Sequence, residues 1–132
     1  MKQLEVVIAG DAVLIKERFQ RALSRVDGCL VVGAAIDEDA AVALICSIDP
    51  DVVILDIRMP HKNGIGVLKE INHRNPTSLI IMFTADESVI LRDACFAAGA
   101  GFYLNKSQMT ELLNICRQQL AEKSGTKSSK EF

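Results

Sequence analysis

The chain has 132 residues, 49% of them hydrophobic, and this size and composition suit one compact domain with a sizeable core. Its 15 basic and 17 acidic residues give a formal net charge of −2, so no overall positive field would draw it to nucleic acid or anionic lipid. No apolar run approaches the roughly 18 residues of a membrane helix, so we expect a cytoplasmic protein that does not enter membranes.

Strand and helix patterns alternate from the start of the chain. A β-branched run predicts a strand over Leu4 to Ala9, and apolar residues at helical spacing predict a helix over Ala12 to Val26. The pattern repeats as a strand over Leu30 to Ile36 and a helix over Asp39 to Ile48, whose leading acids suit the positive end of a helix. Pro50 marks the boundary that follows.

The second half of the chain continues the alternation. Val52 to Leu55 is a continuous apolar run, as expected of a central parallel strand that is covered on both faces. Further helices are predicted over Ile65 to Ile71, Val89 to Ala98 and Met109 to Leu120, and further strands over Leu79 to Phe83 and Gly101 to Leu104.

Five consecutive strand-helix units predict an α/β fold. Short connections imply parallel strands and right-handed crossovers, so we expect a five-stranded parallel sheet with helices on both faces and the flavodoxin-like order 2-1-3-4-5. We assign residues 1–121 to this domain. Residues 122–132 lack apolar periodicity and are rich in Lys and Ser, so they are predicted to form a polar tail or linker.

The four cysteines are widely spaced along the chain. Cys29, Cys46, Cys95 and Cys116 lie in apolar runs and form no Cys-x-x-Cys pair or Cys/His cluster. We therefore interpret them as reduced core residues in a reducing compartment.

Polar residues follow four of the predicted strands. Asp11, Asp56, Thr84 and Lys106 would all stand at carboxyl ends of neighbouring strands, around the crevice where open α/β sheets bind ligands. Two carboxylates can hold Mg²⁺ through oxygen, while a hydroxyl and an ammonium group can bind phosphate oxygens. A carboxylate that attacks phosphorus forms an acyl phosphate, so this set of residues indicates phosphoryl chemistry.

At these positions the sequence resembles the receiver domains of bacterial two-component response regulators, over about Lys2 to Leu120. The resemblance lies in four motifs at family-like separations: Val52-Val53-Ile54-Leu55-Asp56-Ile57-Arg58-Met59-Pro60, Asn63-Gly64, Phe83-Thr84-Ala85 and Tyr103-Leu104-Asn105-Lys106. Lys106 is followed by Ser107 where many receivers have proline. This is similar to the subclass that carries a helix-turn-helix DNA-binding output domain.

The resemblance implies a role for each site residue. Asp56 would accept a phosphoryl group from a sensor histidine kinase or a phosphotransfer protein. The implied cofactor is Mg²⁺, bound by Asp11, Asp56 and the backbone carbonyl of Arg58. Thr84 and Lys106 would then bind the phosphoryl oxygens.

The resemblance also implies a switch. Thr84 would move toward the phosphate, and the ring of Tyr103 would rotate into the space behind it, which changes the surface near the fourth helix and fifth strand. Such a domain catalyses its own phosphorylation, and in some cases its dephosphorylation, but it is primarily a signalling switch that controls an output such as transcription. A homodimer is compatible with this role, and DNA would be bound only through an output domain that this chain lacks.

Two departures from the family pattern bear on these expectations. Receivers usually carry two adjacent acids after the first strand, but Gly10 precedes Asp11 here, so we expect weaker Mg²⁺ binding with phosphorylation retained. Ser107 in place of proline leaves the geometry of the loop after Lys106 open, because the family's cis peptide costs about 2.5 to 4 kcal/mol without proline.

Other functions fit the sequence less well. A flavin-binding carrier would need a hydroxyl- and glycine-rich loop where Asp11 stands, and the glycine-rich loop of P-loop nucleotidases is missing. A phosphatase with an aspartyl nucleophile would carry an acid at Arg58. The open alternative is a pseudo-receiver, an interaction module of the same fold that signals without phosphate.

Overall fold

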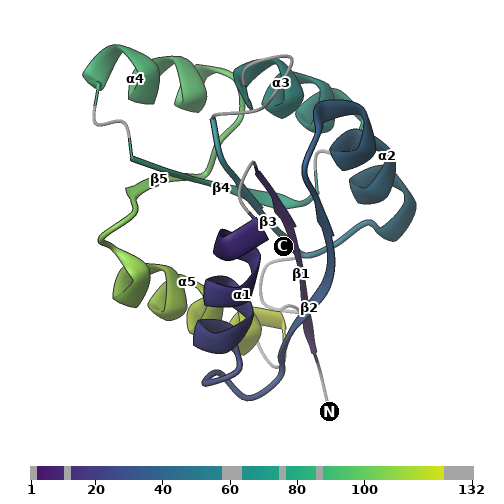
Figure 1. Cartoon of the computed structure of the whole chain (residues 1–132), viewed down its shortest axis with the longest axis vertical. Coiled ribbons are helices and arrows are strands. Elements are labelled where there is room, and N and C mark those ends of the chain that lie inside the picture. The colour runs from purple at the N-terminus through teal and green to yellow at the C-terminus, as the bar shows by residue number, and fades with distance from the viewer. Residues whose placement is uncertain (1–2, 11–12, 58–63, 75–76, 86–87, 124–132) are drawn as a thin grey trace, which may run out of the picture.

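Strands and helices alternate in the computed structural model, which describes residues 3–10, 13–57, 64–74, 77–85 and 88–123 (Figure 1). The strands are β1 (Leu4–Ala9), β2 (Cys29–Ala35), β3 (Val52–Leu55), β4 (Leu79–Thr84) and β5 (Phe102–Asn105). The helices are α1 (Val13–Leu23), α2 (Glu38–Ile48), α3 (Gly64–Arg74), α4 (Val89–Ala97) and α5 (Met109–Ala121). The predicted strand-helix units are confirmed.

The strands form one parallel sheet in the order β2-β1-β3-β4-β5, which confirms the predicted topology. Ala9 pairs with Leu55, and Leu55 pairs with Met82. The carboxyl ends of β1, β3 and β4 therefore meet at one edge of the sheet, called the carboxyl edge below. The strands begin at the opposite edge, called the base.

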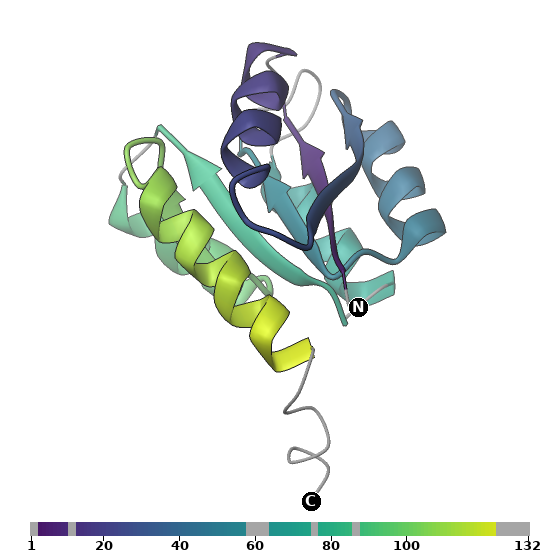
Figure 2. The ribbon, with the colours of Figure 1, turned by 90° about the horizontal axis from the view of Figure 1, so that it is seen from below.

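Helices cover both faces of the sheet. Figures 1 and 2 show α1 and α5 on one face and α2, α3 and α4 on the other. Because successive side chains of a strand point to opposite faces, Val6 packs with Phe19 and Leu112 under α1 and α5, whereas Val7 packs with Ile45 under α2. The two buried clusters hold the sheet rigid, so its carboxyl edge can present side chains at fixed positions.

Helix boundaries differ from the predicted ones by a few residues. The helix α1 ends at Leu23, before the predicted Val26, because the N–H groups of Arg25 and Val26 turn back to the carbonyls of Ala22 and Leu23. Gly28 then takes a positive φ of 91°, which reverses the chain into β2. Among the described helices, none has the length and apolar character that crossing a membrane requires.

The cysteines are free thiols, but one of them is not a core residue. Cys95 and Cys116 are buried, Cys29 is half-buried, and Cys46 is exposed on α2. The interpretation of all four as core residues is therefore wrong for Cys46. The apolar run around it covers the inner side of α2 with Ala41, Val42 and Ile45, and Cys46 falls on the outer side.

Candidate functional site

The carboxylate of Asp56 stands at the carboxyl edge, directly after the fully buried strand β3. Its backbone N–H donates to the carbonyl of Ala9 at 2.9 Å, so the pairing of β1 with β3 extends one residue beyond Leu55. The side chain is only 8% exposed. The sheet thus fixes the backbone on which this carboxylate sits, and its neighbours exclude most of the water.

Lys106 reaches the same carboxylate from the loop after β5. Its Nζ lies 3.0 Å from Oδ2 of Asp56, and the lysine side chain is 29% exposed. The strand β4 separates β5 from β3, so the side chains of Lys106 and Asp56 together bridge two strand spacings, or roughly 9 to 10 Å. The resulting ion pair is a charge-assisted hydrogen bond in a partly dry setting, where it is stronger than on an open surface.

Thr84 and Tyr103 lie on the neighbouring strands. Thr84 ends β4 and is completely buried, while Tyr103 is half-buried against the cluster under α2, α3 and α4. Tyr103 pairs with Met82, and Thr84 follows Met82 by two residues on the same strand. Because residues two apart on a strand share a face, Thr84 and Tyr103 point to the same side of the sheet.

Two glycines let the backbone come close to Asp56. A Cβ atom on Gly10 would lie 3.0 Å from the Cβ of Asp56, which is a tight contact. A Cβ atom on Gly64 would lie 2.6 Å from the carbonyl oxygen of Asp56 and 2.7 Å from the Cα of Ile57. The sequence identified Gly64 only as part of a family motif. The structure shows that the start of α3 packs directly against the backbone of Asp56 and Ile57.

Two predicted metal ligands, Asp11 and Arg58, lie outside the described residues. Within the described residues, no three His, Cys, Asp or Glu side chains gather in a way that could hold a metal ion. Of the predicted ligands, the structure therefore describes Asp56 alone. It brings Asp56 and Lys106 into contact and places Thr84 at the end of the strand between them.

Side-chain hydrogen bonds shape the loop that carries Lys106. Oδ1 of Asn105 accepts from the backbone N–H of Ser107 at 2.9 Å and also from the Ser107 hydroxyl. The Asn105 N–H donates to Oε1 of Gln108 at 2.9 Å, and the Gln108 N–H returns to the Asn105 carbonyl at 3.0 Å. This is an asparagine-centred turn of the kind that needs no proline. No peptide bond in the described ranges is cis.

Comparison with known proteins identifies the family to which the chain belongs. A profile for the response regulator receiver domain matches residues 6–117. Among curated proteins, the chain is 36% identical over 113 residues to the Probable transcriptional regulatory protein NarL of Mycobacterium tuberculosis, a match that covers 85% of this chain and 52% of that protein. It is 28% identical over 109 residues to the transcriptional regulatory protein YdfI of Bacillus subtilis, covering 83% and 51%.

Solved structures give the same answer. A LuxR-family two-component response regulator from Aurantimonas superimposes with a TM-score of 0.84 at 27% identity, covering 91% of this chain and 86% of that one. The response regulator domain of Thermotoga maritima CheB superimposes with a TM-score of 0.83 at 25% identity, covering 91% and 98%. The chain spans about half the length of the two curated regulators it matches.

Proposed function

This chain belongs to the response regulator receiver domains, and on that basis we propose that Asp56 takes a phosphoryl group from a histidine kinase or a phosphotransfer protein. The observation that carries the proposal is the 3.0 Å contact between Oδ2 of Asp56 and Nζ of Lys106. This contact joins the family's acceptor motif to its lysine motif across 50 residues of sequence.

The chemistry follows from the positions of these two side chains. An oxygen of Asp56 attacks the phosphorus of a phosphohistidine, so an O–P bond forms while the N–P bond breaks and its electron pair returns to the imidazole nitrogen. A phosphoryl group brings about −1.5 to −2 charges toward a carboxylate, which repels them. Lys106 offsets this repulsion because its ammonium group already lies on Oδ2. The hydroxyl of Thr84 would donate a hydrogen bond to a phosphoryl oxygen.

The donor chemistry at this edge fits Mg²⁺, which prefers oxygen ligands and keeps several waters. Asp56 supplies a carboxylate, and Asp11 would supply a second because it directly follows Gly10, which lies against Asp56. The backbone carbonyl of Arg58 would be the third ligand. When bound there, the ion supplies positive charge that stabilises the transferring group.

We propose that phosphorylation shifts the protein between two packings through Thr84 and Tyr103. Their position on one face of the sheet supports this, because a movement of the Thr84 hydroxyl toward the phosphate would change the space beside Tyr103. A bias of a few kcal/mol is enough to change which packing dominates. The affected surface would be that of α4 and β5.

The direct test is incubation with a small acyl phosphate donor, with and without Mg²⁺, followed by intact mass measurement. A single Mg²⁺-dependent phosphate adduct is expected, because both the donor and Asp56 are negatively charged and need the cation to approach. No adduct under either condition would favour the pseudo-receiver, which shares the fold and signals without phosphate.

Restoring the missing acid at Gly10 should tighten Mg²⁺ binding. We expect Gly10→Asp to lower the Kd for Mg²⁺ by roughly threefold to thirtyfold, because a further carboxylate acts on the ion through its waters. The new Cβ atom would meet Asp56 at 3.0 Å, so Gly10→Ala separates this steric cost from the effect of charge. Titration calorimetry checks the constants. An affinity in Gly10→Asp no higher than in Gly10→Ala would contradict the prediction.

Loss of the Asn105 side chain should loosen the loop that carries Lys106. Asn105→Ala removes the acceptor of two Ser107 donors, so we expect a loss of about 1 kcal/mol in unfolding free energy and several-fold slower adduct formation. Urea unfolding and the time course of intact mass measure the two effects. Asn114→Ala is the matched control, since among the described residues that exposed side chain accepts from Arg117 alone, and its loss should neither lower the unfolding free energy nor slow adduct formation. Equal adduct rates in the two variants would refute the role of the turn.

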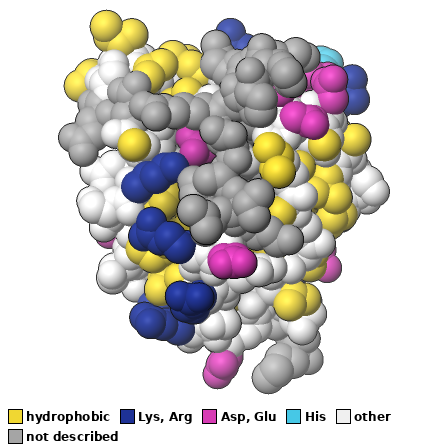
Figure 3. All heavy atoms as spheres, viewed as in Figure 1, with side chains coloured by type: hydrophobic (Ala, Val, Ile, Leu, Met, Phe, Trp, Pro, Cys, Tyr) yellow, Lys and Arg dark blue, Asp and Glu magenta, His cyan; other side chains and the backbone are white. Residues whose placement is uncertain are grey.

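A protein that delivers the phosphoryl group would meet positive charge on the face of the domain that α1 and α5 cover. Figure 3 shows Lys and Arg side chains gathered in a column on the face where α1 and α5 lie. Arg18 and Arg21 on α1, Arg25 in the turn after it and Arg117 on α5 are exposed. Such a face favours an acidic partner surface and speeds its approach, although the net charge of the chain is −2. This supports a kinase or phosphotransfer partner with an acidic docking surface.

We further propose that the domain, residues 1–121, controls transcription through a DNA-binding region encoded beyond it. Both curated regulators are about twice as long as the matched segment, and residues 122–132 would be the linker. The unbridged thiols favour the reducing cytoplasm as its compartment.

A further inference from the structure

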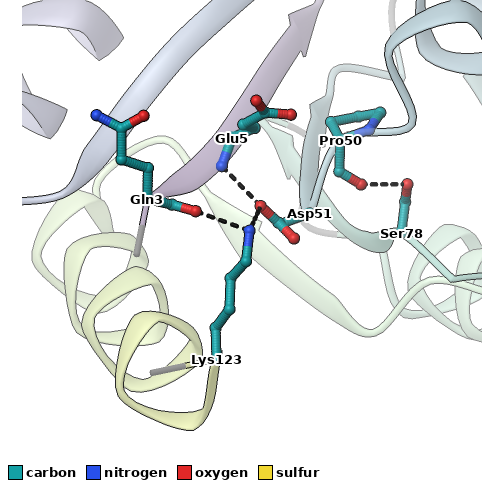
Figure 4. Close-up of polar contacts among 6 residues, drawn as sticks. All are labelled: Gln3, Glu5, Pro50, Asp51, Ser78 and Lys123. Atoms are coloured by element: carbon teal, nitrogen blue, oxygen red, sulfur yellow. Dashed lines mark hydrogen bonds and ion pairs between the residues drawn. The ribbon is translucent and has the colours of Figure 1, made fainter. Parts of the chain in front are cut away.

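A second polar centre lies at the base of the sheet, at the far end from Asp56 (Figure 4). Nζ of Lys123, just beyond α5, lies 2.8 Å from Oδ2 of Asp51 and donates to the carbonyl of Gln3 at 2.7 Å. These contacts cross 72 and 120 residues of sequence. They tie the point where the chain leaves α5 to the segments that enter β1 and β3, and we call them the clasp.

Asp51 is built into the sheet as the receiving group. Its Oδ2 also accepts from the backbone N–H of Glu5 at 2.8 Å, while its own N–H donates to the Glu5 carbonyl and its carbonyl accepts from Leu79. It therefore bonds to both neighbouring strands before β3 begins. The carboxylate is held in place whether or not Lys123 is present, so it is a preorganised acceptor.

The surroundings of the clasp favour a cation. The residues that line a cavity of about 310 Å³ beside it include the acidic residues Asp49, Asp51 and Glu122, and Lys123 is the one basic residue among its described lining residues. Asp51 and Lys123 are each 30% exposed, so water reaches the pair but does not surround it. An ammonium group at this place offsets part of the acidic charge.

The helix α5 connects the clasp to the phosphoryl site. It begins at Met109, directly after the turn that carries Lys106, and its buried residues Leu112 and Cys116 pack on the sheet. Figure 2 shows the helix running along the sheet. The loop before the helix is thus tied to Asp56 through Lys106, and the residue after its end is held at the base.

We propose that the base of the sheet is a docking site for the chain's own exit segment, with Lys123 as the docked group and Asp51 and the Gln3 carbonyl as its receptor. The clasp fixes the position and direction in which the polypeptide leaves the domain. In regulators that continue beyond this point, it would set where the following region starts. This role is independent of whether Asp56 is phosphorylated.

Hydrogen exchange of the whole chain, measured by mass spectrometry, tests the clasp. Lys123→Met keeps the length of the side chain and removes its charge and donors. We expect roughly threefold to tenfold faster exchange in peptides from Ile115 onward, with β5 unchanged, since an ion pair whose side chains are each 30% exposed stabilises only the local turn. Lys69→Met, the same change at an exposed lysine on α3, should leave those peptides unaffected.

A second variant tests whether Asp51 is the residue that holds Lys123. Asp51→Asn keeps an oxygen for the Glu5 N–H but loses the charge that attracts Lys123, so it should speed exchange in the same peptides. The double variant should exchange no faster than Lys123→Met alone. Additive effects, or exchange in Lys123→Met equal to that in Lys69→Met, would overturn the proposal. If Asp51→Asn fails to fold, the comparison of exchange rates between Lys123→Met and Lys69→Met tests the proposal by itself. Adduct formation on Asp56 should be normal in Lys123→Met. A failure of the proposed phosphorylation can therefore be distinguished from a failure of the clasp.

Discussion

Asparagine at position 56 should leave the protein folded and without any phosphate adduct. The amide has nearly the shape of the carboxylate, so the buried position stays filled, but it lacks the nucleophilic charge that attacks phosphorus. The contact with Lys106 becomes an ordinary hydrogen bond to the amide oxygen. Because Lys106 is 29% exposed and remains solvated, we expect a change in unfolding free energy of only about 1 kcal/mol.

The measurement compares intact masses after incubation with an acyl phosphate donor and Mg²⁺. Asp93→Asn is the matched control, because that aspartate is 71% exposed on α4 and should keep full adduct formation. An adduct on Asp56→Asn would mean that another residue is the acceptor. Loss of the adduct in both variants would indicate that the reaction depends on overall charge rather than on this carboxylate.

Loss of the Lys106 ammonium group should slow the transfer of the phosphoryl group to Asp56 but should not abolish it. Lys106→Met retains the apolar stem that crosses β4 but leaves the charge of Asp56 without its ammonium partner. Repulsion between the carboxylate and the incoming phosphoryl group then rises, which slows adduct formation without removing the acceptor. The contrast between the two variants separates the nucleophile from the group that stabilises it.

The sheet and the position of Asp56 at its carboxyl edge could be predicted from the sequence because both leave a local signal. The continuous apolar run before Asp56 predicts a buried central strand, and helical spacing around it predicts the crossovers, so the strand order follows from general rules. Thr84 and Lys106 then reach the same edge by topology alone. The direct contact between Asp56 and Lys106 goes beyond that prediction and comes from the coordinates.

Contacts between polar side chains and distant backbone leave no such signal. Nothing in the pattern around Asn105 indicates that its amide replaces a proline-dependent loop, because one polar residue in a loop resembles any other. Lys123 falls within the stretch that composition assigns to a polar tail, and its bonds to Asp51 and Gln3 depend on where α5 ends in space. Such contacts need coordinates, since the partners are far apart in sequence and no periodicity relates them.

A methyl group at Gly64 should damage the site more than its small size suggests. The Cβ atom of Gly64→Ala would lie 2.6 Å from the Asp56 carbonyl oxygen and 2.7 Å from the Ile57 Cα, and backbone atoms cannot rotate away as side chains can. The hydrogen bond from the Gly64 N–H to the Ile57 carbonyl, at 2.6 Å, holds the two segments at this separation. Either α3 or the backbone of Asp56 and Ile57 must therefore move.

We expect Gly64→Ala to lower the unfolding free energy by about 1 to 3 kcal/mol, as overpacking does, and to slow phosphorylation at least tenfold because the backbone beside Asp56 shifts. Urea unfolding and the time course of intact mass measure both effects. Gly66→Ala is a control of opposite sign: this glycine is exposed on the same helix, so alanine there should stabilise the protein by up to about 1 kcal/mol. If both variants were stabilised alike, Gly64 would be an ordinary helical glycine, and the close approach of α3 to the backbone of Asp56 and Ile57 would not matter for phosphorylation.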